Sequence, residues 1–264
     1  MLLDKSQEYI EKNTSVGGMD ISYKMAGEGP AVLVLHGWGR GSDAWIGVQA
    51  MLSRAGYRVI VPDLPGFGKS IPPATAWGIK EYAEFVKEFA DTLGLQEFFL
   101  VGHSFGGQTA ALFATLYPQR VLRLILVGAA VVRRKPSPYT RSLSFVAKTG
   151  NMFFSFWPFS LLQPIIRKVF YKFLGSSDHL YTKGIMKEVR KNVIQEDLRY
   201  LLSHISKRTL IVWGDQDVTT PTKDAYIIQK LIPGSILKIV PGANHSFNGK
   251  ESELISTMLE FLKQ

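Results

Sequence analysis

The chain has 264 residues, of which 46% are apolar and 20% are charged, and none is cysteine. This composition is typical of a globular protein and excludes a disordered, collagen-like or disulfide-stapled chain, a thiolate metal site and a cysteine nucleophile. The formal net charge is +9, and the excess lies within residues 129–207, where 14 Lys and Arg accompany 4 Asp and Glu without a nucleic-acid-binding motif.

Short apolar runs, each followed by a turn or a polar loop, predict strands along the chain. They lie at residues 19–25, 31–35, 57–61, 98–101, 124–127, 209–213 and 236–240. Several are apolar at every position, which is the pattern of strands covered on both faces in a parallel sheet.

The segments between these runs have apolar residues at the spacing of amphipathic helices. Ile79, Tyr82, Val86 and Phe89 share one face of a predicted helix that Gly94 ends, and further helices are expected at residues 108–117 and from about residue 251. We therefore predict an α/β fold with a mostly parallel, twisted sheet of about eight strands and helices on both faces.

The pattern changes after Ala130. Four prolines break the chain, aromatic residues gather within residues 153–173, and the alternation of strands and helices returns at Thr209. The prolines are Pro136, Pro138, Pro158 and Pro164. We predict a core domain at residues 1–130 and 206–264 with a helical insertion at residues 131–205. Because the insertion holds the charge excess, it is either a solvated face or a surface for an acidic partner or an anionic membrane.

Localisation is predicted from what the chain lacks. Asp4, Glu8 and Glu11 stand where a signal peptide needs an apolar run, and the longest uncharged stretch, residues 149–166, contains two prolines. With no cysteine, the expectation is a cytoplasmic protein without a transmembrane segment. We also expect no cofactor and no metal ion, since neither a dinucleotide fingerprint nor a metal-ligand cluster is evident.

The pentapeptide Gly102-His103-Ser104-Phe105-Gly106 lies between the strand at residues 98–101 and the helix at 108–117. A sharp turn from strand to helix needs glycine around its central residue and presents that residue's side chain at the edge of the sheet. Backbone N–H groups at the start of the helix point to the same place. Ser104 is therefore the candidate nucleophile.

A serine hydroxyl needs a base, and the base needs an orienting acid. His245 follows the strand that ends at Val240, and Asp215 and Asp217 follow the strand that ends at Trp213. These loops lie at the carboxyl ends of strands, where ligand sites of open α/β sheets gather. His245 is the expected base and either aspartate could orient it. The other histidines, His36, His103, His179 and His204, lie in other motifs or in the insertion.

The tetrapeptide His36-Gly37-Trp38-Gly39 follows the strand at residues 31–35. Attack of a serine on a carbonyl group needs N–H donors for the oxyanion that forms. The backbone N–H groups of Trp38 and of Phe105, the residue after the nucleophile, are the expected donors.

With these residues in place, the chain resembles proteins of the α/β-hydrolase fold over nearly its full length. The resemblance rests on HGWG at 36–39, DLPGFGKS at 63–70, GHSFGG at 102–107, YPQRV at 117–121, WGDQD at 213–217 and GANH at 242–245. It implies a catalytic triad of Ser104, His245 and Asp217, in preference to Asp215, and a helical cap at residues 131–205 that covers the pocket.

The resemblance leaves the substrate open. We predict a serine carboxylesterase that acts on small to medium acyl or aryl esters through an acyl-enzyme. Carbon–carbon bond hydrolases, lactonases and perhydrolases use the same triad, although the first usually carry a proline in the oxyanion loop, which HGWGRGSDAW lacks. Dehalogenases and epoxide hydrolases of this fold carry aspartate in place of Ser104. A ligand-binding receptor on a hydrolase scaffold is a further alternative.

One subgroup of the α/β-hydrolase fold suggests an acidic protein as a partner for the basic insertion. HGWG with DLPGFG is similar to esterases that remove the methyl group from pimeloyl-carrier protein, although GHSFGG differs from their GWSLGG. Those enzymes dock an acidic carrier protein on a basic cap. The basic charge of the insertion, with Arg133, Arg134, Lys135 and Arg141 near its start, is compatible with such a carrier, but no docking arginine of those enzymes is carried over to a residue of this chain.

Overall fold

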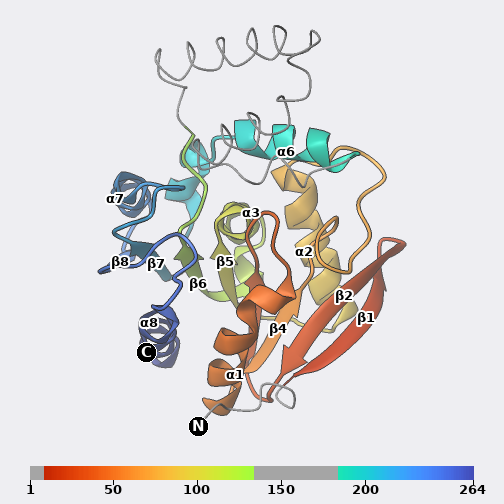
Figure 1. The fold of residues 1–264 in the computed structure, drawn as a ribbon, viewed down its shortest axis with the longest axis horizontal. Coiled ribbons are helices and arrows are strands. Elements are labelled where there is room, and N and C mark those ends of the chain that lie inside the picture. The colour runs from red at the N-terminus through yellow and green to blue at the C-terminus, as the bar shows by residue number, and fades with distance from the viewer. Residues whose placement is uncertain (1–8, 134–183) are drawn as a thin grey trace, which may run out of the picture. The chain divides into compact units, whose positions relative to one another are not determined.

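An eight-stranded sheet organises the residues that the structure, a computed structural model, describes, which are 9–133 and 184–264 (Figure 1). The strands are β1 (Ile10–Val16), β2 (Met19–Ala26), β3 (Ala31–Leu35), β4 (Arg58–Pro62), β5 (Phe98–His103), β6 (Val121–Val127), β7 (Thr209–Gly214) and β8 (Ile236–Val240). Their order in the sheet is β1-β2-β4-β3-β5-β6-β7-β8. Strand β2 is antiparallel to β1 and β4, and all other neighbours are parallel, which confirms the predicted sheet.

The apolar runs form strands because both faces of the sheet are covered. Strands β3 and β7 are buried at every position. The helices around them are α1 (Ile46–Arg54), α2 (Ile79–Thr92), α3 (Phe105–Leu116), α6 (Met186–Gln195), α7 (Thr222–Leu231) and α8 (Glu251–Lys263).

Two hydrophobic cores lie on opposite faces of the sheet. Leu100 of β5 packs into the core that α2, α3 and α7 share, whereas the adjacent Val101 packs into the core with α1 and α8. This alternation along β5 follows from the two-residue period of a strand. It decides which residues at the end of β5 face which layer.

Strand β1 was not among the predicted strands. Its residues are mostly polar and exposed, so no apolar run marks it. It pairs with β2 through a two-residue turn in which Gly17 and Gly18 have φ values of 55° and 77°, a conformation that favours glycine. Helices α1 and α7 were also not predicted individually.

The predicted insertion at residues 131–205 is only partly described. Residues 184–205 include α6 and a short 3₁₀ helix, Arg199–His204, and this short helix packs against α3 and α7. Val189 and Val193 of α6 are buried in the same core as α2 and α3. The prolines, most of the aromatic residues and the uncharged stretch of the insertion lie outside the described residues, within 134–183. In the described segments, no helix has the length and apolar character needed to cross a membrane.

Candidate active site

Ser104 occupies a strained turn between β5 and α3. Its φ of 53° is in the left-handed region, which typically costs a non-glycine residue about 1–3 kcal/mol. Its N–H donates to the Val127 carbonyl at 3.0 Å, and its own carbonyl accepts from the N–H groups of Gln108 and Ala130, also at 3.0 Å. The backbone of Ser104 is therefore fixed between the ends of β5 and β6 and the first turn of α3.

The glycines around Ser104 allow neighbouring main chains to approach this turn. A Cβ on Gly102 would collide with the Gly106 carbonyl oxygen, and a Cβ on Gly106 would collide with that of Leu35 at the end of β3. A Cβ on Gly107 would lie 2.6 Å from the Cβ of Ala129. The glycines found in the sequence motif are thus required by packing between β3, β5 and β6.

His245 forms a hydrogen bond with Asp217. The distance from His245 Nδ1 to Asp217 Oδ2 is 2.7 Å, and the Asp217 side chain is fully buried. The other oxygen of the carboxylate, Oδ1, accepts from the N–H groups of Thr219 at 2.9 Å and Thr220 at 2.8 Å, while the Thr220 hydroxyl donates to Oδ2 at 2.8 Å. Four donors therefore fix the position and the charge of this carboxylate.

The pKa of Asp217 is lowered from its ordinary value. Burial alone would raise it, but the hydrogen bond and charge of His245, together with the donors of Thr220, outweigh the effect of burial. The carboxylate can only accept a hydrogen bond, so Nδ1 of His245 is the donor and carries the hydrogen in the neutral imidazole. The lone pair at Nε2 is then available to take a proton.

Asp215 has a different role from Asp217, although the two lie in the same loop. Its Oδ1 accepts from the N–H of Gly242 at 2.7 Å, and its own N–H donates to the Val240 carbonyl at 3.3 Å. Asp215 therefore joins the loop after β7 to the loop after β8. The residues alone left two acids open and the resemblance favoured Asp217, which is the acid that the structure pairs with His245.

The His245 side chain, from the loop after β8, lies at the end of β6, which is the strand beside β5 and Ser104. A Cβ on Gly128, the residue after Val127, would be 3.2 Å from His245 Nδ1 and 3.4 Å from Asp217 Oδ2. The Ser104 N–H is bonded to Val127 itself. Among the described residues, no hydrogen bond joins the Ser104 hydroxyl to His245.

The residues of the two predicted oxyanion donors, Trp38 and Phe105, lie next to each other in the fold. The rings of Trp38 and Phe105 meet edge to face with their centroids 5.4 Å apart. Phe105 is the first residue of α3, so its N–H has no carbonyl one turn earlier in the helix. A Cβ on Gly37 would be 3.3 Å from the Ser104 Cβ, so the loop that carries Trp38 lies against the serine.

Sequence reasoning missed the residues that hold this loop. His36 Nε2 accepts from the Leu64 N–H at 2.9 Å, and burial lowers the pKa of His36, which keeps the ring neutral for that role. The Asp63 carboxylate accepts from the N–H groups of Ser42 at 2.6 Å and Lys69 at 2.9 Å. Both residues lie in motifs quoted for the resemblance, but the motifs do not show what they contact.

Sequence reasoning also missed Thr220. An aspartate followed closely by threonine is the pattern of an Asx turn, and this was the signal in the sequence. The Thr220 hydroxyl lies 2.8 Å from Asp217 Oδ2 and 3.2 Å from His245 Nδ1, so it contacts both members of the pair.

Arg133 does not present a free cation for an acidic partner. Its guanidinium donates to the Gln108 Oε1 at 2.7 Å and to the Val193 carbonyl at 3.2 Å. These bonds join the segment after β6 to α3 and α6. Arg134, Lys135, Arg141 and His179 lie outside the described residues, and His204 is an exposed residue of the short 3₁₀ helix.

Replacing Thr220 with valine is expected to lower the free energy of unfolding at neutral pH by about 1.5–3 kcal/mol, because a charged acceptor loses a hydrogen bond. The folded-state pKa of Asp217 is lowered, so its ionised form stabilises the fold above the ordinary pKa of 3.8. That contribution is lost as the pH falls through the folded-state value. The effect of the substitution should therefore shrink below pH 3.8.

Urea unfolding from neutral pH down to about pH 3 measures this difference. Exposed Thr219→Val is the matched control, since it keeps the backbone N–H that Asp217 accepts from. If Thr220→Val lowered the free energy of unfolding by the same amount at every pH, the role of Thr220 as a donor to ionised Asp217 would be contradicted.

Comparison with known proteins supports the fold. A sequence profile of the alpha/beta hydrolase fold matches residues 30–170, just over half of the chain. An uncharacterised protein of Mycobacterium tuberculosis is 29% identical over 94% of this chain and 80% of its own length. A 2-hydroxy-6-oxononadienedioate/2-hydroxy-6-oxononatrienedioate hydrolase of a Pseudomonas species is 28% identical over 82% of each chain.

Among solved structures, an esterase of Exiguobacterium antarcticum has a TM-score of 0.74 and 25% identity, over 97% of this chain and 100% of its own. The eight-stranded, mostly parallel sheet agrees with the profile match. The chain therefore belongs to the α/β-hydrolase fold family, and it is a hydrolase.

Proposed function

We propose that the protein is a serine esterase that cleaves carboxylic esters of small to medium acyl or aryl groups. The observation that carries the proposal is the 2.7 Å hydrogen bond between His245 and buried Asp217, beside the strand end that holds Ser104. A neutral imidazole fixed by a buried carboxylate is the base that a serine hydroxyl needs.

In the proposed mechanism, His245 Nε2 takes the hydroxyl proton as Ser104 Oγ attacks the ester carbonyl. The N–H groups of Trp38 and Phe105 stabilise the negative oxygen of the tetrahedral intermediate. His245 then gives the proton to the leaving alcohol, and an acyl-serine remains. Water, deprotonated by the same histidine, releases the acid, while Asp217 stabilises the imidazolium in both steps.

The carbon–carbon bond hydrolases are the second candidate. The relative from Pseudomonas bears such a name, and it is similar to this chain over most of its length. The oxyanion loop of this chain lacks the proline that carbon–carbon bond hydrolases usually carry. This difference favours ester hydrolysis.

A substrate panel separates the candidates. We expect kcat/KM to be highest for aryl esters of graded acyl length, lower for a lactone and lowest for a vinylogous diketone. Faster cleavage of the diketone than of every ester would move the assignment to carbon–carbon bond hydrolysis. Negligible turnover of all three, with a large shift of the melting temperature on ligand binding, would favour a receptor.

We propose that residues 131–205 form a cap that shapes the substrate pocket, since residues 184–205 pack on the core and the sequence of residues 131–183 interrupts the α/β pattern. An acidic carrier protein gains no support from the described residues, because Arg133 is engaged within the protein. A cytoplasmic location stays a prediction from composition.

A further inference from the structure

His103 lies next to the proposed nucleophile but faces the opposite layer of the sheet. It is the last residue of β5, two positions after Val101, whose side chain packs with α1 and α8. Its ring meets the Trp45 ring at a centroid distance of 6.2 Å and an interplanar angle of 66°. The proposed mechanism gives this side chain no part.

The His103 ring contacts the residue that carries the proposed base. Its Nε2 lies 2.8 Å from the main-chain carbonyl oxygen of His245, and the two ring centroids are 4.8 Å apart. A carbonyl oxygen only accepts, so Nε2 of His103 carries the hydrogen and donates it. Within the part of the chain that the structure describes, this is the hydrogen bond that reaches the main chain of His245.

The loop around His245 bonds to itself and to the loop after β7, where Asp215 accepts from the Gly242 N–H and the Gln216 N–H donates to the Ala243 carbonyl at 3.0 Å. The Asn244 Oδ1 accepts from the N–H groups of Ser246 at 3.0 Å and Asn248 at 3.2 Å, and Phe247 has a φ of 55°. An exposed contact from Arg40 to the Ser246 hydroxyl at 3.2 Å adds to these. The bond from His103 adds a tie from this loop to the end of β5.

The surroundings of His103 keep the donor in place. Burial lowers the pKa of His103 to about 3, with the charge of His245 as the next contribution, so the ring stays neutral near pH 7. A Cβ on Gly37 would lie 2.8 Å from His103 Nδ1, so the loop that carries Trp38 packs against the other ring nitrogen. The His103 ring is thus held between the loop that carries Trp38 and the loop that carries His245.

We propose that His103 is a positioning residue, which holds the His245 main chain from the face of β5 opposite to Ser104 and so places the imidazole for proton transfer. The inference rests on the proposed hydrolysis. Displacements of about 1 Å at reacting groups can cost on the order of 100-fold in rate, so one lost hydrogen bond at this loop should be visible in kcat.

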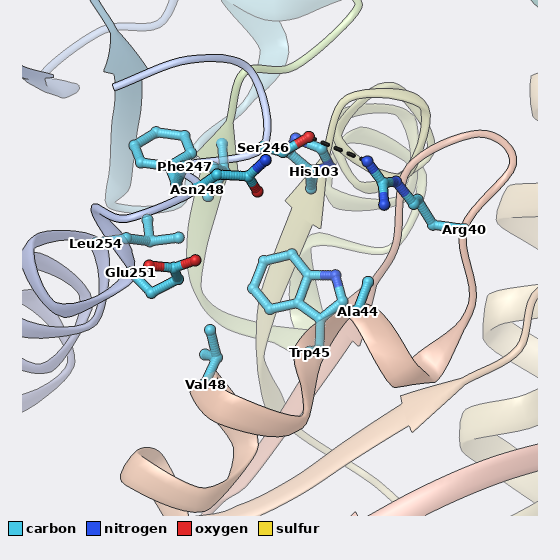
Figure 2. A pocket seen from close by; sticks show the side chains of 11 residues that line it. Arg40, Ala44, Trp45, Val48, His103, Ser246, Phe247, Asn248, Glu251 and Leu254 are labelled. Atoms are coloured by element: carbon cyan, nitrogen blue, oxygen red, sulfur yellow. Dashed lines mark hydrogen bonds between the residues drawn. The ribbon is translucent and has the colours of Figure 1, made fainter. Parts of the chain in front are cut away.

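A cavity beside His103 makes the proposal testable by addition of a small molecule. The pocket has a volume of about 150 Å³. Its lining includes Trp45, Val48, Phe247 and Leu254, which Figure 2 shows. A cavity of this size accommodates one small aromatic ring. Removal of the His103 side chain would join its space to the pocket and admit free imidazole.

The first test compares two substitutions of similar size. His103→Gln keeps an N–H donor near the Nε2 position, whereas His103→Met removes it. We expect kcat for an aryl ester to fall about 10- to 100-fold in His103→Met with KM within about twofold, and to stay within about threefold of the wild type in His103→Gln. Glu251→Gln is the control, since this exposed residue lines the pocket without contacting His103 or His245 through a hydrogen bond.

The second test does not depend on turnover. The Nδ1–H proton of His245, which donates to Asp217, is followed by NMR, and we expect its resonance to broaden or shift in His103→Met but not in His103→Gln. In His103→Ala, the His245 resonance should shift and kcat should fall. Added imidazole should restore both the wild-type resonance position and kcat. The imidazole background is measured with the same variant carrying Ser104→Ala.

The outcomes separate the two proposals. A wild-type protein that cleaves no ester overturns the proposed function, and the His245 resonance then still decides the role of His103. Equal kcat values and an unchanged His245 resonance in His103→Met would overturn the positioning role and leave ester hydrolysis in place. A loss of activity in His103→Gln as large as in His103→Met, with no rescue of His103→Ala by imidazole, would also overturn it.

Discussion

Ser104→Ala is expected to lower kcat for aryl ester hydrolysis by at least about 10³-fold and to leave the fold intact. The substitution removes the hydroxyl that forms the acyl-enzyme, while the bonds that fix this residue to Val127, Gln108 and Ala130 are made by its backbone. Residual rate over water would come from the oxyanion donors and from substrate binding. Stopped-flow or steady-state release of p-nitrophenol measures the change.

The control for this variant is a serine on the surface. Ser252→Ala alters an exposed residue at the start of α8 and should retain the wild-type rate. The melting temperature of Ser104→Ala should lie close to that of the wild type, which separates lost chemistry from lost structure. Ester turnover at the wild-type rate in Ser104→Ala would refute the mechanism.

Asp217→Asn is expected to lower kcat by about 10³- to 10⁴-fold with little change in KM. The asparagine side chain fits the site, but its NH₂ group can face Nδ1 of His245 and select the tautomer with the hydrogen on Nε2. That tautomer has no lone pair at Nε2 for the serine proton. Loss of the carboxylate also removes the charge that stabilises the imidazolium.

Asp215→Asn is the matched control, because it lies two residues away in the same loop and bonds to Gly242 rather than to His245. Its kcat should stay within about threefold of the wild type. If Asp215→Asn lost as much activity as Asp217→Asn, the assignment of the orienting acid would be wrong.

Much of the sheet could be predicted from the sequence because its parallel strands are buried on both faces. The buried run Ala31–Leu35 was predicted with the bounds that the structure shows, and so was the edge strand Ile236–Val240, which is largely exposed but keeps apolar residues. Strand β1 was missed for the opposite reason, since an exposed edge strand needs no apolar pattern. The Gly17-Gly18 turn was its only strong local signal.

The site was predictable where chemistry is tied to local geometry. The glycines around Ser104 mark a turn that only small residues allow, so the motif identifies the candidate nucleophile directly. The choice between Asp215 and Asp217 was not accessible in this way. Both aspartates follow β7, and hydrogen bonds to Gly242 and His245, far along the chain, distinguish them.

His103 was missed because its contact depends on tertiary structure. The residue lies within a quoted motif, but its partner is a main-chain carbonyl 142 positions away. No side-chain pattern in the sequence marks such a carbonyl. Thr220 is the intermediate case, since its place three residues after Asp217 is a local signal and its contact with His245 is not.

Covalent labelling by a fluorophosphonate ester, followed by mass mapping of the peptides, tests most directly whether Ser104 is a nucleophile activated by His245. We predict one phosphonate per chain, attached to Ser104, with labelling abolished in Ser104→Ala and slowed by orders of magnitude in His245→Ala. A chain that remains unlabelled, carries the phosphonate on another residue, or reacts equally fast without the imidazole of His245 would contradict the account.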